Sequence, residues 1–281
     1  MLVVKFQGGI GNQLFEYAFY KELQYLGKTV YADLSEYRVK HQVREFELSK
    51  LGLHVEEAPR TVLRKLGHLH DSVYDKMMFR IKGKKNTVRD EYGQLFNPKY
   101  FEEDNVLLDG YWQTKKYFSD VFDEVVSEID FGSGLDLENR AIADEMKKRE
   151  SVSIHMRFGD YVGHKLYSGI CTAEYYKKAI ACIKKHVISP EFYVITDDEE
   201  AASKVLEDED YTVLRNNRGS DSYKDMYLIS SCKHHIMANS SFSWWGVMLD
   251  KKKDGVVISP NKWLNGIDDS DIWEEEWIRM P

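Results

Sequence analysis

The sequence has few cysteines and no long apolar run. Its three cysteines are an odd number and include no C-x-x-C pair, which argues against a disulfide scaffold and a cysteine-ligated zinc site. No stretch of about 18 uninterrupted apolar residues occurs, so the sequence predicts no membrane-spanning helix. The N-terminus also lacks the basic and apolar regions of a signal peptide. We therefore expect a cytoplasmic protein.

The sequence also lacks an excess of positive charge. It has 39 Lys and Arg residues against 47 Asp and Glu residues, for a formal net charge of −8. General nucleic-acid binders usually present a basic surface, so we expect no nucleic-acid partner. Apolar residues make up 43% of the chain, which is enough for a folded core. The length predicts one large or two medium domains.

Common cofactor and metal motifs are missing as well. The chain contains no Walker-type glycine loop with a lysine and no G-x-S-x-G sequence,. Asp269-Ser270-Asp271 has the D-x-D form that can hold a metal on a nucleotide sugar, but its polar surroundings favour a surface loop. No other His, Cys or carboxylate set has convincing ligand spacing. The sequence therefore predicts neither a metal nor a cofactor.

The N-terminal stretch predicts a βαβ unit. Residues 2–6 form an apolar run, a glycine-rich turn follows at 8–11, and residues 12–27 have apolar side chains at helical spacing,. A second apolar run at 29–32 predicts the next strand, so the two strands belong to a parallel sheet. The free N–H groups at the start of such a helix suit an anion or a sugar hydroxyl.

A dinucleotide site is the alternative interpretation of this turn. Gly9 and Gly11 follow a strand, and Asp33 stands at the end of the next strand, which is the usual place for the ribose-binding acid. Leu14, however, occupies the third glycine position, where a larger side chain hinders helix packing and the approach of a pyrophosphate. The sequence therefore disfavours NAD or FAD binding.

Residues 60–89 form a basic segment. They carry nine basic and two acidic side chains, with apolar residues interleaved at roughly helical intervals. A basic amphipathic segment can contact an anionic membrane surface, here the inner membrane face. A solvated helix packed on its own domain is the favoured interpretation.

The central stretch at 151–161 reads S-V-S-I-H-M-R-F-G-D-Y. Alternating apolar and polar residues predict a short, half-buried strand. His155, Arg157 and Asp160 then follow at its carboxyl end, where ligands bind in open α/β sheets. Arg157 offers a planar fork of donors for a phosphate or carboxylate. An Arg157–Asp160 ion pair that braces a turn is an equally weighted alternative.

Two further strands of the second half end in polar residues. A strand predicted at 191–195 leads to Asp197, whose carboxylate could accept two N–H groups from guanine or cap the following helix. A strand predicted at 234–238 leads to N-S-S-F-S-W-W-G at 239–246. There, small hydroxyls are expected to cap a helix whose N-terminus is a second anion site, with the tryptophans anchored in the core.

Two charged segments are expected to be helical. Residues 136–150 predict a helix that bridges the two halves, which places the domain boundary between 149 and 150. Trp273 and Trp277 stand among acids near the end of the chain and predict an amphipathic terminal helix.

Three sequence blocks together resemble the α-1,2-fucosyltransferases of glycosyltransferase family 11. They are G-G-I-G-N-Q-L-F at 8–15, H-M-R-F-G-D-Y at 155–161 and the block at 239–246, with weaker similarity at 110–113 and 192–198. The blocks follow the family's order along essentially the whole chain. The resemblance implies an α/β, GT-B-like fold with two Rossmann-like domains facing a cleft. Residues 1–149 would form the acceptor side, and residues 150–281 would hold GDP-β-L-fucose.

The resemblance implies an inverting, metal-independent transfer of L-fucose to the 2-hydroxyl of a galactose-type acceptor in an oligosaccharide or surface glycan. Arg157 would grip the diphosphate, and Asn12 would border the reacting sugar from the first domain. Donor binding would fall to His155, Asp197, Asp198, Asn239, Ser240, Ser241, Phe242, Ser243, Gly11 and Gln13. Of these, Asp197 or Asp198 would read guanine.

Some roles stay open at this point. Asp160 is the nearest carboxylate to the central motif and a candidate general base, but it could instead position Arg157, and a loose oxocarbenium ion would need no strong base. Family members usually carry a second arginine where this chain has Phe158, so the role of that arginine is unassigned. Use of another GDP-sugar, a dinucleotide-dependent oxidoreductase and a non-catalytic glycan-binding protein are the alternative functions.

Overall fold

The computed structural model describes residues 1–39, 44–68, 86–90, 95–132, 134–161, 163–252, 254–267 and 271–281, except for the side chain of Asp160. The chain divides into two compact units, Met1–Asp130 and Phe131–Pro281. Helix α5 (Leu137–Met146) packs against α8 (Tyr223–Ser231) and so belongs to the second unit, whereas the sequence placed the boundary at the far end of this helix. Most of the basic segment and Asp269 lie outside the described residues.

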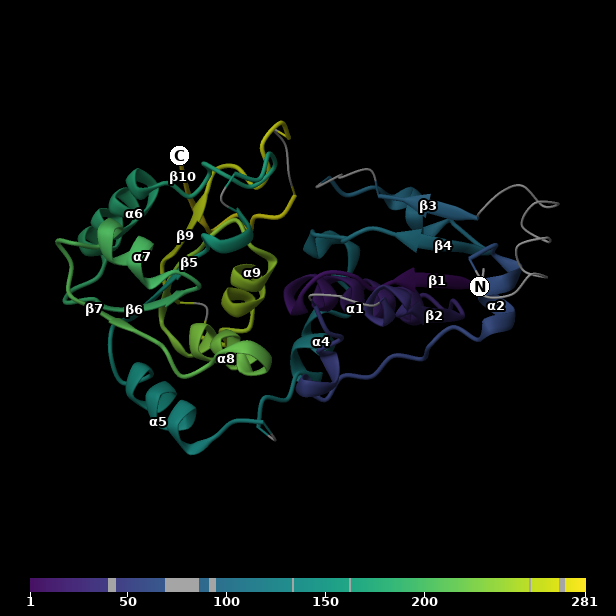
Figure 1. Ribbon diagram of the computed structural model, residues 1–281, viewed down its shortest axis with the longest axis horizontal. Helices are drawn as coiled ribbons and strands as arrows, with labels where there is room; N and C mark the ends of the chain where they lie inside the picture. The colour runs from purple at the N-terminus through teal and green to yellow at the C-terminus, as the bar shows by residue number, and fades with distance from the viewer. Residues whose placement is uncertain are drawn as a thin grey trace. The chain divides into compact units, whose positions relative to one another are not determined.

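The first unit is built around a parallel sheet in the order β2-β1-β4-β3 (Figure 1). Its strands are β1 (Leu2–Lys5), β2 (Val30–Asp33), β3 (Thr87–Arg89) and β4 (Val106–Asp109). Its α-helices are α1 (Ile10–Tyr25), α2 (Arg60–Lys65) and α4 (Phe122–Glu128). Short 3₁₀ helices lie at Ser35–Arg38, Leu48–Leu51, Pro98–Phe101 and Lys115–Tyr117. The predicted βαβ unit is confirmed.

Helix α1 is buried along most of its length. Phe19 stacks on Trp112 with ring centroids 4.3 Å apart, and Tyr117 meets the same indole edge-on at 5.6 Å. Trp112 is fully buried, so its ring forms part of the core of the first unit. Aromatic packing of this kind fixes α1, and with it the glycine turn at its start, against the rest of the unit.

The second unit contains a six-stranded parallel sheet in the order β10-β9-β8-β5-β6-β7. Its strands are β5 (Ser151–Met156), β6 (Glu191–Thr196), β7 (Tyr211–Val213), β8 (His234–Ile236), β9 (Val257–Pro260) and β10 (Ile278–Met280). Besides α5 and α8, its helices are α6 (Ala173–His186), α7 (Glu199–Val205) and α9 (Ser241–Met248), with 3₁₀ turns at Gly159–Tyr161 and Gly219–Asp221.

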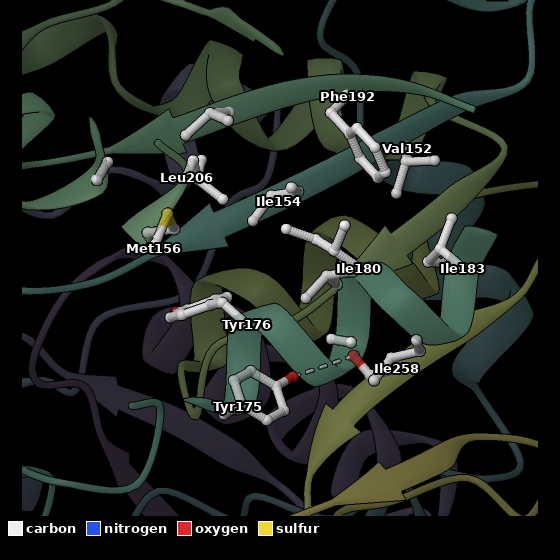
Figure 2. Close-up of a cluster of buried hydrophobic side chains, with 14 of the residues drawn as sticks. Val152, Ile154, Met156, Tyr175, Tyr176, Ile180, Ile183, Phe192, Leu206 and Ile258 are labelled. Carbon is white, nitrogen blue, oxygen red and sulfur yellow. Dashed lines mark hydrogen bonds between the residues drawn. The ribbon is translucent and has the colours of Figure 1, made fainter. Parts of the chain in front are cut away.

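One face of this sheet carries a closely packed apolar core. Val152 and Ile154 of β5 meet Ile180 and Ile183 of α6 (Figure 2). The hydroxyl of Tyr175 satisfies its hydrogen-bonding need by donating to backbone carbonyl oxygens, among them that of Met237 at 2.6 Å. The core therefore holds α6 on the sheet without leaving a buried hydroxyl unpaired.

The opposite face of β5 is buried too, so the expected half-buried strand is wrong. All six residues of the strand are buried. Ser151, Ser153 and His155 tolerate this because they find polar partners on other elements, such as Lys233 N–H and the ring of His235. Alternation in the sequence indicated the two faces correctly, but it could not show that the polar face would also be covered.

The C-terminal tail also corrects the sequence analysis. Ile278–Met280 forms β10, which pairs in parallel with β9, instead of an amphipathic helix. The indole N–H of Trp273 donates to the carbonyl oxygen of Pro260 at 3.0 Å, and Arg279 lies over the same ring. Trp273 therefore anchors the tail beside β9. The two parallel sheets with their helices confirm the predicted α/β class with two Rossmann-like domains.

Candidate active site

The candidate site of the second unit lies at the carboxyl ends of β5, β6 and β8. The chain passes from β5 through α6 to β6 on one side, whereas β8 lies on the other side of β5. Open parallel sheets bind ligands at such a switch in strand order. The three polar segments singled out in the second half therefore meet at one edge of one sheet.

Arg157 is held in place by Asp197. Its Nη1 lies 3.2 Å from Asp197 Oδ2, while Oδ1 of the same carboxylate accepts the backbone N–H of Phe158 at 2.8 Å. Asp197 thus fixes both the guanidinium and the backbone after β5. About a quarter of the Arg157 side chain is exposed, so the guanidinium still meets solvent.

Gly159 makes this contact possible. A Cβ atom at position 159 would lie only 2.7 Å from Asp197 Oδ2, so a larger residue would push the carboxylate away. Asp198 points elsewhere, because its side chain caps α7 by accepting the N–H of Ala201 at 2.9 Å. The helix cap proposed for Asp197 is therefore made by Asp198. The Arg157–Asp160 pair stays untested, because the Asp160 side chain is not described.

Tyr161 joins Arg157 to the segment before α9. The Arg157 guanidinium carbon lies 5.7 Å from the centre of the Tyr161 ring, within cation–π range. The Tyr161 hydroxyl donates to the backbone oxygen of Asn239 at 3.1 Å. The sequence analysis gave Tyr161 no role, because an aromatic residue in a turn carries no signal of what its ring or hydroxyl will contact.

His155 and Ser243 join the end of β5 directly to α9. Nδ1 of His155 lies 2.8 Å from Ser243 Oγ, and the same oxygen accepts the N–H of Ala238 at 3.1 Å. Burial, and to a lesser extent the positive charge of Arg157, lower the pKa of His155 to about 3,. The imidazole is therefore neutral at physiological pH.

The start of α9 differs from the predicted hydroxyl cap. Ser240 occupies the N-cap position but forms no side-chain cap bond. The nearby Ser243 hydroxyl is bonded to Ala238 and His155. The first N–H groups of a helix have no partner within the helix. Those of α9, together with the partly exposed Ser241 and Phe242, therefore remain suited to an anion.

Asn239 is buried and braces the loops around the site. Its Nδ2 donates to the backbone oxygen of Trp263 at 3.1 Å, and its Oδ1 lies 3.4 Å from the sulfur of Cys171. These contacts tie the segment before α9 to two neighbouring loops. The structure thus places Asn239 beside the anion-binding groups, with its amide already engaged.

In the first unit, the predicted residues lie in the first turn of α1. Gly11 and Gln13 are buried. The Gln13 amide donates to the backbone oxygens of Gly8 and Glu45 and accepts the N–H of Glu47, so it supports the glycine turn. Asn12 is partly exposed, and its Oδ1 accepts from Gln113 Nε2 at 2.9 Å.

The sequence analysis missed Glu16, one turn further along α1. Its side chain is fully buried, and its carboxylate accepts the N–H of Gln7 at 3.0 Å. Burial raises the pKa of Glu16 well above its ordinary range, although the Gln7 bond and Lys5 oppose that shift. An acidic residue among the apolar residues of α1 could have drawn attention to Glu16, but only the structure shows that its carboxylate holds the backbone just before the glycine turn.

Two general properties complete the description. Within the described ranges, no group of three or more His, Cys, Asp or Glu side chains is placed to hold a metal ion. No helix in the described part of the chain is long and apolar enough to cross a membrane.

Comparison with known proteins gives a family match along the chain. Residues 1–280 match glycosyl transferase family 11. An α-1,2-colitosyltransferase from Escherichia coli is 28% identical over 300 residues, covering 100% of this chain and 99% of that protein. The O-antigen biosynthesis glycosyltransferase WbnK, also from Escherichia coli, is 26% identical, covering 97% of this chain and 98% of that protein.

Solved structures give more distant matches. NodZ α-1,6-fucosyltransferase soaked with GDP-fucose is 15% identical, with a TM-score of 0.48 and coverage of 88% of this chain and 92% of that chain. POFUT1 in complex with GDP is 11% identical, with a TM-score of 0.47 and coverage of 91% and 97%.

Proposed function

Because the chain belongs to glycosyl transferase family 11, it is a glycosyltransferase, and we propose that it transfers L-fucose from GDP-β-L-fucose to a galactose-type sugar. The acceptor position is the 2-hydroxyl, and the acceptor is part of an oligosaccharide or surface glycan. The observation that carries the proposal is the pairing of Arg157 with Asp197 beside the His155–Ser243 link to α9. This arrangement gathers anion-binding groups from two segments of the second unit.

The physical argument concerns the leaving group. When the glycosidic bond to the nucleotide breaks, negative charge develops on the diphosphate, and fixed donors aimed at that charge lower the barrier. Each hydrogen bond to a charged group contributes about 1.5–3 kcal/mol. One arginine and a few N–H groups at a helix start therefore supply several kcal/mol. The proposed transfer requires no metal.

The remaining roles form part of the same proposal. Asp197 orients Arg157, and each of its carboxylate oxygens can accept a further hydrogen bond. Asp197 or Asp198 reads guanine. The first unit contributes Asn12 to the reacting sugar and carries the acceptor. Asp160 remains the candidate base, and the second arginine of the family has no replacement assigned at Phe158.

A second donor is a specific rival. One relative of this chain is named an α-1,2-colitosyltransferase, so a GDP-sugar other than GDP-fucose is the alternative to be tested. Both donors would use the same diphosphate groups of the site. They would differ only in contacts to the sugar ring.

A donor and acceptor panel tests the proposal. The purified protein is incubated in EDTA with GDP-fucose or GDP-colitose and with β-galactosides, α-galactosides and glucosides. We expect fucose transfer to galactosides, with the new linkage at the 2-hydroxyl by NMR of the product. Faster transfer of colitose would establish the rival donor, and a strict need for a divalent ion would contradict the metal-independent mechanism.

A further inference from the structure

Two serine–histidine pairs lie on the polar face of β5. In the first, Ser153 Oγ lies 2.8 Å from Nδ1 of His235, and Nε2 of His235 lies 3.4 Å from Oδ2 of Asp250. In the second, Ser243 Oγ lies 2.8 Å from Nδ1 of His155. Nε2 of His155 has no hydrogen-bond partner among the residues that the structure describes. The first histidine is therefore engaged at both ring nitrogens and the second at only one.

The direction of the Ser243 bond follows from its other partner. Ser243 Oγ already accepts the N–H of Ala238, and Ser243 is only 1% exposed. Its hydroxyl proton has one acceptor within the described residues, Nδ1 of His155. The reverse arrangement, with a proton on Nδ1, would leave the buried hydroxyl proton unsatisfied, which is the costlier choice.

The charge state of His155 is consistent with this direction. Its ring is buried, and burial, followed by the charge of Arg157, lowers its pKa to about 3. A neutral imidazole carries one proton. If Nδ1 accepts from Ser243, that proton resides on Nε2.

The location of this N–H gives it a use. His155 lies at the carboxyl end of β5, two residues before Arg157, and its ring centre lies 5.5 Å from that of Phe242 in the first turn of α9. A neutral N–H donor here adds a hydrogen bond to an anion without placing a second cation beside Arg157. An unprotonated nitrogen in the same position would repel a diphosphate oxygen.

We propose that His155 donates a hydrogen bond from Nε2 to the diphosphate of the nucleotide sugar, and that Ser243 is the positioning residue that fixes the required tautomer. This inference rests on the proposed function. It makes His155 a neutral donor throughout the reaction, not an acid or a base, and it gives the Ser243 hydroxyl a role in orienting a proton. It also assigns a donor beside the single guanidinium of Arg157.

The tautomer can be measured directly on the full chain. With ¹⁵N-labelled histidine, long-range ¹H–¹⁵N correlation distinguishes the protonated from the unprotonated ring nitrogen, and the His155→Gln variant assigns the signals. We expect a neutral ring with the proton on Nε2 from pH 5 to pH 8. A proton on Nδ1, or a titration of His155 within that range, would overturn the inference.

GDP is the probe for the donor role. Addition of GDP is expected to shift the Nε2 resonance of His155 and to leave that of His235 unchanged. Ser243→Ala is expected to convert His155 to a mixture of tautomers. The matched control is Ser153→Ala. It removes the hydroxyl from the Ser153–His235 pair and is expected to leave the His155 tautomer unchanged. Retention of a single Nε2–H tautomer in Ser243→Ala would contradict the role assigned to Ser243.

Steady-state kinetics distinguish hydrogen-bond donation by His155 from a purely structural role of this residue. His155→Ala is expected to lower kcat/KM about 10- to 100-fold, the effect of losing one hydrogen bond to a charged group. His155→Gln places a neutral N–H near the Nε2 position and is expected to recover much of that loss, with an unchanged pH profile. Equal activity of the Ala and Gln variants would contradict donation from Nε2.

Failure of this inference is distinguishable from failure of the proposed function. If GDP binds through Arg157 but leaves the His155 resonances unchanged, the donor role of His155 is wrong and the proposed function stands. If neither GDP binding nor sugar transfer is observed, both are overturned, whatever tautomer His155 has.

Discussion

At the residue scale, the site depends on side chains whose orientation is fixed by partners far away in the sequence. Asp197 holds Arg157 from 40 residues further along the chain and bonds the Phe158 N–H with its other oxygen. A guanidinium that is already oriented loses less entropy when it binds an anion. This orientation is consistent with the proposal that Arg157 binds the diphosphate of the nucleotide sugar.

Replacing Arg157 tests the proposed role of its guanidinium in stabilising the diphosphate. We expect Arg157→Ala to lower turnover at least about 100-fold, because it removes charge stabilisation from the leaving group. Arg157→Lys should fall between the wild type and the alanine variant, since it keeps the charge and loses the planar fork. Steady-state kinetics with GDP-fucose and the best galactoside measure both variants.

The chain offers a matched control for this replacement. Arg149 pairs with Glu191 at the opposite, amino-terminal end of β6, at 2.8 Å. Arg149→Ala removes a similar ion pair from the same sheet and should leave turnover close to that of the wild type. A near-normal rate in Arg157→Ala with the fold intact would remove this residue from the mechanism.

Asp225 of α8 gives a pH-dependent prediction about stability. Burial raises its pKa from 3.8 to about 7, although a hydrogen bond from Asn217 opposes the shift. Because the folded state prefers the neutral acid, this contribution to stability is complete below about pH 4 and is lost as the pH rises through about 7. Asp225→Asn should therefore stabilise the protein at pH 8 by roughly 2–4 kcal/mol and have little effect near pH 4.

Denaturant unfolding of Asp225→Asn at pH 8 and at pH 4 measures this effect. Asp208→Asn, at an exposed position of the same unit, serves as the control and should change the free energy of unfolding little at either pH. If Asp225→Asn gave the same change at both pH values, the ionisation of Asp225 would not be the cause.

The sequence predicted candidate residues for the site but not their contacts. His155, Arg157, Asp197 and the segment at 239–243 were predicted from their places at the ends of apolar strands and from the resemblance to family 11. The partner of Arg157 was not predicted to be Asp197, since the pair forms only when β5 and β6 lie side by side. Glu16 was overlooked because its role depends on a bond to the Gln7 backbone that the folded chain alone reveals.

At the scale of elements, the spacing of apolar residues correctly predicted central strands and helices. It failed for the strand at the edge of the second sheet. The strand predicted at 191–195 and the helix predicted after the glycine turn were confirmed as β6 and α1. The tail has acids around Trp273 and Trp277, as an amphipathic helix would, but it forms the edge strand β10. The tail forms a strand because β9 offers it backbone hydrogen-bonding groups. The sequence of the tail alone does not show that such a neighbour is present.

The contact between α8 and α9 gives a prediction for packing. A Cβ atom at Gly246 would lie 2.7 Å from Cγ2 of Ile229. Gly246→Ala should therefore lower the free energy of unfolding by about 1–3 kcal/mol through overpacking. Chemical denaturation measures the loss.

A double variant serves as the control for that prediction. Ile229→Ala removes the obstructing methyl group, so adding it to Gly246→Ala should cost less than the sum of the two single changes. Strictly additive effects would show that the two residues do not clash. Because the start of α9 is proposed to bind the diphosphate, Gly246→Ala should also weaken GDP binding.

At the scale of the whole molecule, the chain consists of two α/β units with parallel sheets. The first contributes a glycine turn supported by Gln13 and Glu16, and the second contributes Arg157, His155 and the start of α9. We propose that the first unit serves the acceptor and the second the nucleotide sugar. In this proposal, the positive charge that the diphosphate requires comes from the second unit and not from a metal ion.

Calorimetric titration of GDP into the full chain in EDTA tests this central claim most directly. We expect GDP to bind without a divalent ion and Arg157→Ala to weaken binding at least about 10-fold, the equivalent of one hydrogen bond to a charged group. Binding that requires a divalent ion, or equal affinity of the wild type and Arg157→Ala for GDP, would contradict the account.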